Sequence, residues 1–198
     1  EGLDVTIDSY PYTCGNTTID AVLPYWFLAK LPAAYSSRWD RLLLRAEMDV
    51  GLALLGFGYR DFQIMDVAVE GWEWANGLRV TDIARRWGCS GIDAVLRISE
   101  ASRGAALMLY HRFSGEPGRE EPLEAVLAHP SCLFESDAVH RRQGHPNPAG
   151  QGTFPRVLGE YSRRRGLFSL EDAVHRMTGA SADRFGLPDR GRVQAGLA

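Results

Sequence analysis

The chain has 198 residues, of which 45% are hydrophobic and 24% are charged, an ordinary composition for one globular domain or a large part of one. Its 22 basic and 25 acidic residues give a net charge of −3 and form no block of five like charges, so neither nucleic acid nor an anionic membrane is an expected partner. The apolar stretches fall short of the ~18 residues that a transmembrane helix needs.

The basic residues are almost all arginines, with Lys30 as the single lysine, a bias typical of a GC-rich bacterial genome. The three cysteines lie far apart in the sequence, without a CxxC pair, which argues against a disulfide framework. We therefore predict a bacterial, cytoplasmic protein. The chain begins at Glu1, without a start methionine or a signal-peptide pattern, and we expect further sequence upstream of it.

The first strand is predicted near the N-terminus, where apolar and polar residues alternate over residues 3–8 and end at Tyr10-Pro11-Tyr12. Residues 20–75 then contain four of the five tryptophans, several phenylalanines and two prolines. This stretch is predicted to form an inserted, partly helical, lid-like subdomain. Residues 62–69 within it are a further strand candidate.

Strands and helices alternate in the second half of the chain. Apolar runs at 105–110 and 132–134 predict two buried strands, and the second leads into Glu135-Ser136-Asp137. Helix starts and stops punctuate the rest: Pro155 is predicted near the first turn of one helix and Ser169 as the N-cap of another. The predicted helices cover residues 81–87, 122–129, 155–165 and 169–177. This order favours an α/β fold, either a βα-barrel or a doubly wound sheet.

Several sequence segments together resemble a known enzyme family. They are GTFPRVLG at 152–159, GLFSLEDAV at 166–174 and DRGRV at 189–193, preceded by DSYPYTCGNTT at 8–18, Ser136-Asp137 and His145-Pro146. As a set they resemble the C-terminal third of D-aminoacylases and related N-acyl-D-amino-acid deacylases of the amidohydrolase superfamily. The resemblance runs over nearly the whole chain, densely over 124–196 and thinly over 25–110.

This resemblance implies that residues 1–198 are the C-terminal portion of a metal-dependent-hydrolase (β/α)8 TIM-like barrel, incomplete, with residues 20–75 as its lid-like insertion. It implies a zinc-dependent amidohydrolase that converts an N-acyl-D-amino acid into a D-amino acid and a carboxylate. The zinc of that family polarises the amide carbonyl and activates water. Its ligands, a cysteine and histidines on earlier strands, would lie upstream of Glu1, which makes the missing N-terminal portion a partner of this chain.

Three positions match family residues that contact the substrate, and one matches a catalytic residue. Asp137 matches the aspartate that closes the last strand, serves as general acid/base and is at most a weak metal ligand here. We expect it at the C-terminal end of a buried strand, with its carboxylate facing a cavity. Tyr10 and Asn16 match a tyrosine and a serine that hydrogen-bond the substrate carboxylate. Asn147 stands where many relatives have an arginine that grips this carboxylate, so the sequence departs from the family pattern there.

Other readings of these residues remain open. Asp137 is also a residue type that caps loops after strands. His140 and His145 are either a metal pair or part of a solvated loop, and His111 either faces a barrel mouth or packs. Cys14 has no identifiable histidine partner, so nucleophilic catalysis is not expected there.

Three functions are compatible with this sequence. The chain is part of a deacylase, part of a related amidohydrolase that acts on another amide or a cyclic imide, or a non-catalytic remnant of the fold. The 198-residue chain alone is expected to bind no zinc tightly and to be inactive, because it supplies too few metal ligands.

Overall fold

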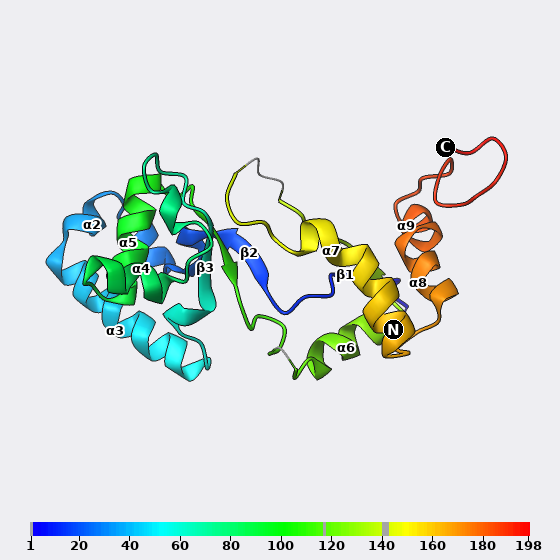
Figure 1. The fold of residues 1–198 in the computed structure, drawn as a ribbon, viewed down its shortest axis with the longest axis horizontal. Coiled ribbons are helices and arrows are strands. Elements are labelled where there is room, and N and C mark those ends of the chain that lie inside the picture. The colour runs from blue at the N-terminus through cyan, green and yellow to red at the C-terminus, as the bar shows by residue number, and fades with distance from the viewer. Residues whose placement is uncertain (1, 117, 140–142) are drawn as a thin grey trace. The chain divides into compact units, whose positions relative to one another are not determined.

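The computed structural model describes residues 2–116, 118–139 and 143–198 of the chain (Figure 1). Its strands are β1 (Ile7–Ser9), β2 (Gly15–Thr18), β3 (Phe62–Asp66), β4 (Leu107–Tyr110) and β5 (Cys132–Phe134). Its α-helices are α1 (Tyr25–Leu28), α2 (Ala33–Ser36), α3 (Arg38–Leu54), α4 (Val80–Trp87), α5 (Gly91–Ser102), α6 (Glu121–Ala128), α7 (Ala149–Arg156), α8 (Leu170–Met177) and α9 (Gly179–Arg184). Short 3-10 turns occupy Ile19–Val22, Tyr59–Asp61 and Glu73–Ala75, and a π-helix spans Val157–Arg164. Among the described residues no helix is long and apolar enough to span a bilayer.

The chain divides into two compact units, which are described separately. The two-stranded unit, named for its sheet, comprises Glu1–Thr13, Ser114–His140 and Asn147–Ala198. The three-stranded unit comprises Cys14–Phe113 and Arg141–Pro146. The chain contains both helices and strands, in agreement with the predicted α/β class, and each unit has its own hydrophobic core.

The three-stranded unit is built on an antiparallel sheet with the strand order β2-β4-β3. β3 and β4 fall within the predicted strand segments 62–69 and 105–110, whereas β2 lies outside the predicted strands. Their antiparallel pairing differs from the parallel pairing expected of an α/β sheet. The apolar run Leu107–Tyr110 signals burial on both faces, which holds for a central antiparallel strand as well as for a parallel one. The run of apolar residues therefore does not predict whether the strand pairs in a parallel or an antiparallel direction.

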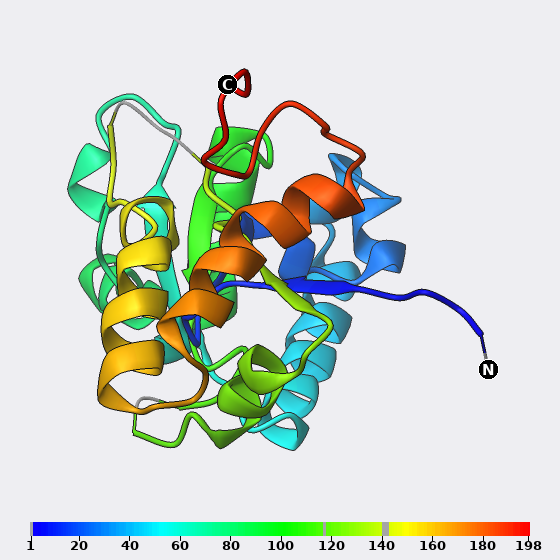
Figure 2. The ribbon, with the colours of Figure 1, turned by 90° about the vertical axis from the view of Figure 1, so that its right-hand side faces the viewer.

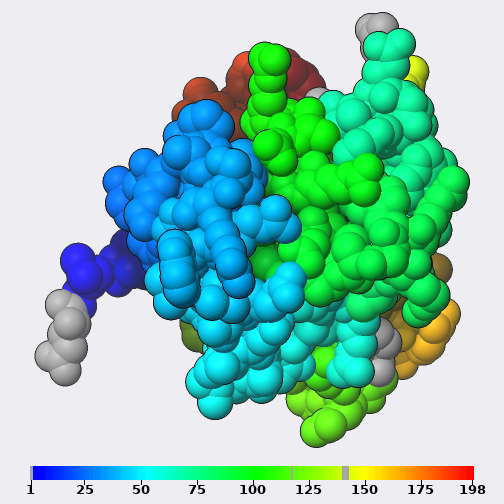
Figure 3. All heavy atoms as spheres, turned by 90° about the vertical axis from the view of Figure 1, so that its left-hand side faces the viewer, coloured from blue at the N-terminus to red at the C-terminus, as the bar shows by residue number. Residues whose placement is uncertain are grey.

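Helix α3 is the longest helix of this unit, with 17 residues, and lies on the face drawn in Figure 3. The side chain of Ser37 accepts a hydrogen bond from the Asp40 N–H at 3.2 Å, which caps the first turn. Leu44, Met48 and Leu52 recur every four residues, so they form one stripe that is buried in the core of the unit.

The predicted subdomain of residues 20–75 is contained in the three-stranded unit, which is larger. The unit begins at Cys14 and continues to Phe113, because β2 and β4 supply the sheet that pairs with β3 and helices α4 and α5 share the same core. A range that stops at residue 75 would separate β3 from β4, its neighbour in the sheet. The lid role of this segment stays a prediction.

The two-stranded unit is organised around a parallel pair, β1 with β5, in which Ile7 faces Cys132 and Ser9 faces Phe134. Figure 2 shows α6, the α7 helix and the α8–α9 pair around these strands. Buried side chains from the second strand and the surrounding helices form its core: Leu123, Leu127, Cys132, Phe134, Val157, Tyr161 and Ala173.

The helix boundaries of this unit follow the predicted punctuation except at one position. The side chain of Ser169 accepts from the Asp172 N–H at 3.1 Å and caps α8, as predicted. The prediction that Pro155 begins a helix is wrong, because α7 begins at Ala149 and Pro155 lies inside it. Proline has no N–H for a helical bond, and the following residues adopt the wider π pattern, in which the Arg165 N–H reaches the Glu160 carbonyl at 2.9 Å.

Arg176 on α8 is a buried cation, 4% exposed, that ties three elements together. Its Nη1 donates to the carbonyls of Leu127, His129 and Cys132 at 2.8, 3.2 and 3.3 Å, and its Nη2 lies 2.7 Å from the Asp172 carboxylate. The guanidinium also stacks on the rings of Phe134 and Phe168, at 4.6 and 4.5 Å from their centroids. Arg176 of α8 therefore holds the end of α6 and the start of β5 against this helix.

We predict that Arg176→Met lowers the free energy of unfolding of the chain by about 2–4 kcal/mol, because three carbonyls lose a charged donor in a buried site. Urea unfolding followed by circular dichroism measures this loss. Arg192→Met is the matched control: Arg192 pairs with Asp183 on the surface, and its loss should change stability by less than about 1 kcal/mol. Equal stability of the two variants would contradict the role given to Arg176.

Candidate active site

The parallel pairing of β1 and β5 brings two predicted site segments to one edge of the two-stranded unit. Tyr10 follows β1 directly, and Glu135-Ser136-Asp137 follows β5. The Glu135 N–H donates to the Ser9 carbonyl at 3.1 Å, which extends the pairing past the last residue of β5. Because parallel strands end at the same edge, the structure places Tyr10 and Asp137 on neighbouring strand ends.

Asp137 lies three residues beyond Phe134, at the carboxyl end of a strand whose side chains at Cys132 and Phe134 are buried. This position agrees with the sequence prediction. Its side chain is exposed, whereas we expected it to face a cavity. Its backbone has a φ of +41°, a left-handed conformation that a non-glycine residue rarely adopts, and its N–H donates to the Glu135 carboxylate. Such backbone outliers gather at functional sites.

Glu135 is a titratable neighbour that sequence reasoning missed. Burial raises its pKa, and the negative charges of Asp137 and Asp8 act in the same direction, against the hydrogen bond from the Asp137 N–H. Glu135 thus lies within electrostatic reach of two further carboxylates, those of Asp8 and Asp137. The sequence signal was present: a second carboxylate stands two residues before Asp137, directly after an apolar strand.

Asn147 is 4% exposed and lies just before α7. Its Oδ1 accepts a hydrogen bond from the Ala149 N–H at 3.0 Å. Its Nδ2 is also buried and has no hydrogen-bond partner among the residues that the structure describes. An unsatisfied buried donor costs about 1–3 kcal/mol, so the environment of this amide is destabilising unless another group accepts its hydrogen bond.

Arg156, inside the GTFPRVLG segment, fastens the chain that follows β1. Its Nε donates to the Pro11 carbonyl at 2.8 Å, and its guanidinium lies over the Tyr12 ring at 5.2 Å from the centroid. On the other side it pairs with Glu120 at 3.3 Å, and Glu120 also accepts from the Tyr161 hydroxyl at 3.0 Å. Arg156 of the GTFPRVLG segment thus has a structural role, because it holds the segment that contains Tyr10 and Tyr12 against α7.

Asn16 lies in the three-stranded unit, on β2, where it pairs with Leu109 of β4. Cys14, just before this strand, is buried, and burial raises the pKa of its thiol, so the thiol is the stable form at neutral pH.

His111 follows β4 in the same unit and is held by polar partners. One of its ring nitrogens, Nε2, lies 2.8 Å from Oε1 of Gln63, whose amide group donates to the Gly77 carbonyl at 2.8 Å. Burial lowers the pKa of His111 to about 4, and the positive charges of Arg79 and His145 act in the same direction while Asp61 opposes them. His111 is therefore a neutral, hydrogen-bonded ring at physiological pH.

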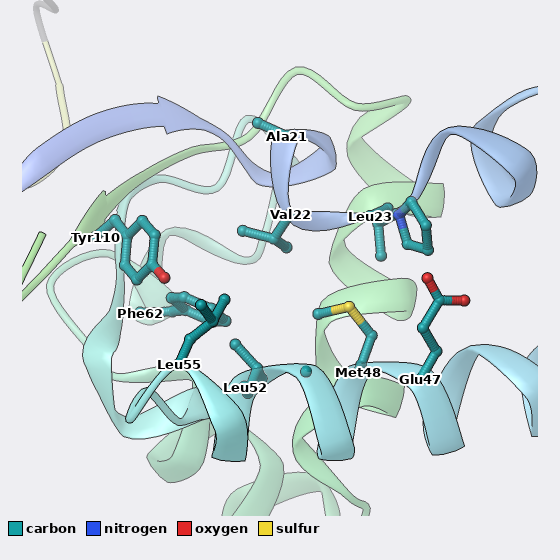
Figure 4. Close-up of a pocket in the computed structure, with 11 residues that line it drawn as sticks. Ala21, Val22, Leu23, Glu47, Met48, Leu52, Leu55, Phe62 and Tyr110 are labelled. Atoms are coloured by element: carbon teal, nitrogen blue, oxygen red, sulfur yellow. The ribbon is translucent and has the colours of Figure 1, made fainter.

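A pocket of about 340 Å³ opens between α3 and the segment Ala21–Pro24 of the three-stranded unit (Figure 4). Met48, Leu52 and Leu55 at α3 face Val22 and Leu23 across it, and Phe62 and Tyr110 close one end. At the other end the Glu47 carboxylate accepts a hydrogen bond from the Trp26 indole N–H at 2.7 Å. The pocket is an apolar hollow, and its lining contains none of the predicted site residues.

The described residues do not form a zinc site. No group of three or more histidine, cysteine, aspartate or glutamate side chains in residues 2–116, 118–139 and 143–198 is placed to hold a metal ion. Burial raises the pKa of the Cys132 thiol to about 11, so this cysteine is a neutral thiol of the hydrophobic core. Of the histidine pair suggested by the sequence, His140 lies outside the described residues. The backbone N–H of His145 donates to the Met65 carbonyl at 2.6 Å.

Comparison with known proteins finds relatives of one kind, although no family model matches the chain. D-aminoacylase of Alcaligenes xylosoxydans xylosoxydans is 31% identical over 193 residues, which are 98% of this chain and 31% of that protein. The N-acyl-D-glutamate deacylase of the same organism is 38% identical over 61% of this chain and 22% of that protein. The crystal structure of N-acyl-D-glutamate deacylase from Bordetella bronchiseptica, complexed with zinc and a phosphonate inhibitor, has a TM-score of 0.68 at 27% identity and covers 100% of this chain and 32% of that one. The chain thus spans about a third of the length of D-aminoacylase and of this structure.

His111 gives the chain a pH dependence of stability that can be measured. Folding lowers its pKa from 6.5 to about 4, so the unfolded chain binds more protons between these pH values and acid favours unfolding. We predict that the free energy of unfolding falls by on the order of 1–2 kcal/mol from pH 7 to pH 4 on account of this half-exposed group. In His111→Gln this part of the loss should disappear, while the exposed-residue control His175→Gln should retain it. Identical pH profiles of urea unfolding for both variants would contradict the assignment.

Proposed function

From the relationship of this chain to the D-aminoacylase family in sequence and fold, we propose that it forms part of a zinc-dependent amidohydrolase. The enzyme cleaves the amide bond of an N-acyl-D-amino acid and releases a D-amino acid and a carboxylate. The observation that carries this proposal is the similarity to D-aminoacylase over 98% of the chain. The three relatives are named D-aminoacylase, N-acyl-D-glutamate deacylase and N-acyl-D-aspartate deacylase. These names favour deacylation of N-acyl-D-amino acids over a cyclic-imide hydrolase or a non-catalytic remnant.

Asp137 is the residue to which we assign the proton transfers. Its carboxylate accepts a proton from the water that attacks the carbonyl carbon of the scissile amide, which gives a tetrahedral intermediate. The protonated carboxyl group then gives this proton to the amide nitrogen as the C–N bond breaks, so the products are an amine and a carboxylate. The position of Asp137 beyond the end of β5 supports the assignment, because barrel enzymes carry catalytic groups at the carboxyl ends of strands.

Tyr10, Asn16 and Asn147 are the residues to which we assign substrate binding. Tyr10 follows β1 on the edge that Asp137 shares, and its segment is held by Arg156. The buried Nδ2 of Asn147 is a neutral donor for the substrate carboxylate, where an arginine would offer two charge-assisted bonds. Bonds to charged groups contribute roughly 1.5–3 kcal/mol against about 1 for neutral ones, so a weaker grip on the carboxylate is part of the proposal.

Zinc enters this proposal as a property of the full-length protein. Within the described residues Asp137 is the one carboxylate that we assign near the metal, and the other ligands are expected outside this chain. We further propose that the three-stranded unit, which contains residues 20–75, serves as a lid-like subdomain and that the barrel of the fold family is completed by the missing portion. The three unpaired cysteines support a reducing, cytoplasmic location in a bacterium.

The function is tested with the full-length protein that carries this chain, purified with zinc. We predict hydrolysis of N-acyl-D-amino acids in preference to N-acyl-L-amino acids and cyclic imides. Asp137→Asn keeps the size of the side chain but cannot accept the proton, and it should lower kcat by about 10²- to 10⁴-fold.

The control for this variant is Asp82→Asn, because Asp82 makes an exposed ion pair with Arg85 on α4 and should leave kcat unchanged. Release of the free amino acid, followed by chromatography, measures the rate. Full activity of Asp137→Asn would remove the acid/base assignment, and inactivity of the wild-type protein on every acyl-D-amino acid would remove the proposed function.

A further inference from the structure

Gly152 lies inside α7, where its backbone is helical and does not require a glycine. Glycine is among the residues that least favour a helix, so space rather than conformation explains its presence here. A methyl group on its Cα atom would overlap the hydroxyl oxygen of Tyr12 and would lie 3.4 Å from the Cζ atom of the same ring. The Tyr12 hydroxyl therefore occupies the place that a side chain would take on this helix.

Two further contacts hold the Tyr12 segment against α7, and all of these residues belong to the two-stranded unit. Arg156 lies four residues after Gly152, on the same face of the helix, and its guanidinium covers the Tyr12 ring at 5.2 Å from the centroid. The Nε of Arg156 donates to the Pro11 carbonyl at 2.8 Å. The segment after β1 thus contacts two successive turns of α7.

The position of Tyr12 determines where Tyr10 lies. The Tyr12 N–H donates to the Tyr10 carbonyl at 3.0 Å, which closes a tight turn around Pro11. The ring of this proline fixes its own φ angle, so the turn has little freedom to bend. A displacement of Tyr12 from α7 is therefore transmitted to Tyr10.

The same helix contacts the segment that follows β5. A methyl group on Gly150 would lie 3.4 Å from the Cβ atom of Ala138, which is the residue after Asp137. Asn147 lies just before the helix and accepts a hydrogen bond from the Ala149 N–H at 3.0 Å. α7 is therefore the common support of the segments to which we assign proton transfer and substrate binding.

We propose that Gly152 is a positioning residue of the candidate active site. It leaves room for the Tyr12 hydroxyl on α7 and thereby holds Tyr10 where it binds the substrate carboxylate. This inference rests on the proposed function, in which Tyr10 binds that carboxylate. A larger side chain at position 152 moves Tyr12 away from α7 and Tyr10 with it, because a closely packed contact has no space for an added methyl group.

The experiment uses the full-length protein with zinc and an N-acyl-D-amino acid. Gly152→Ala should raise KM by about tenfold and leave kcat within about twofold, because a hydrogen bond to the carboxylate is present in both the ground state and the transition state. Gly159→Ala is the matched control: it adds the same methyl group in the adjoining helical segment, where nothing lies within 4 Å. An unchanged KM in folded Gly152→Ala would overturn the proposal.

Two double variants show whether Gly152 acts through Tyr12 and Tyr10. Gly152→Ala combined with Tyr12→Phe removes the oxygen that the new methyl group meets and should restore KM, since the ring carbon at 3.4 Å is at ordinary contact distance. Gly152→Ala combined with Tyr10→Phe should raise KM no further than Tyr10→Phe alone, because both changes remove one interaction. Failure of the rescue, or additive effects with Tyr10→Phe, would overturn the proposed route.

Hydrogen exchange measures the position of the Tyr10 segment independently of catalysis. Amides of residues 10–13 should exchange about tenfold faster in Gly152→Ala than in the wild-type protein, return toward wild-type rates when Tyr12→Phe is added, and stay unchanged in Gly159→Ala. Equal exchange in Gly152→Ala and the wild type would overturn the positioning role. If the wild-type protein hydrolyses no acyl-D-amino acid, the proposed function fails, and the exchange rates still decide whether Gly152 holds the Tyr10 segment. If Gly152→Ala does not fold, as circular dichroism would show, the added Tyr12→Phe should recover the folded protein, and failure to do so would overturn the proposal.

Discussion

The buried guanidinium of Arg176 is the contact on which the geometry of the candidate active site depends. It donates to carbonyls at the end of α6 and the start of β5, and it stacks on Phe134, the last residue of β5. β5 in turn pairs with β1, and these two strands set where Tyr10 and Asp137 leave the sheet. The buried charge of Arg176 takes no part in the proposed chemistry. It positions β5, and therefore the segment after β5 that contains Asp137. The charge itself is stabilised by carbonyl oxygens and Asp172, so the burial of an ion is offset locally.

Glu135 and Asp137, which follow β5, have different roles at this strand edge. Glu135 is half-buried, its pKa is raised, and it accepts the N–H of Asp137. Asp137 is exposed, and its left-handed backbone turns the chain away from the direction in which β5 would continue. Glu135 holds the backbone of Asp137 through this hydrogen bond. The Asp137 side chain is on the surface, where a substrate can reach it. The unsatisfied Nδ2 of Asn147 adds a donor that the same unit leaves without a protein partner among its described residues.

Much of this unit could be predicted from sequence, since its signals are local. The apolar run Cys132–Phe134 is β5, and Ser169 caps α8, because both depend on residues within a few positions. Non-local features could not be predicted. The strands of the other unit pair in antiparallel order because of how the chain returns, which no run of apolar residues records. The start of the helix at Pro155 was predicted wrongly because α7 runs through this proline and continues into the π-helix. Glu135 was missed because its importance comes from burial beside Asp8 and Asp137, a three-dimensional property.

We propose that the ends of β1 and β5 carry the groups that act on an N-acyl-D-amino acid in the full-length protein. The most direct measurement is a crystal structure of the full-length protein with zinc and a phosphonate that mimics the tetrahedral intermediate. We expect an Asp137 carboxylate oxygen at hydrogen-bond distance, about 2.6–3.2 Å, from a phosphonate oxygen, with the Asn147 amide turned to the ligand carboxylate. An Asp137 side chain directed into solvent, more than ~6 Å from the bound phosphonate, would contradict it.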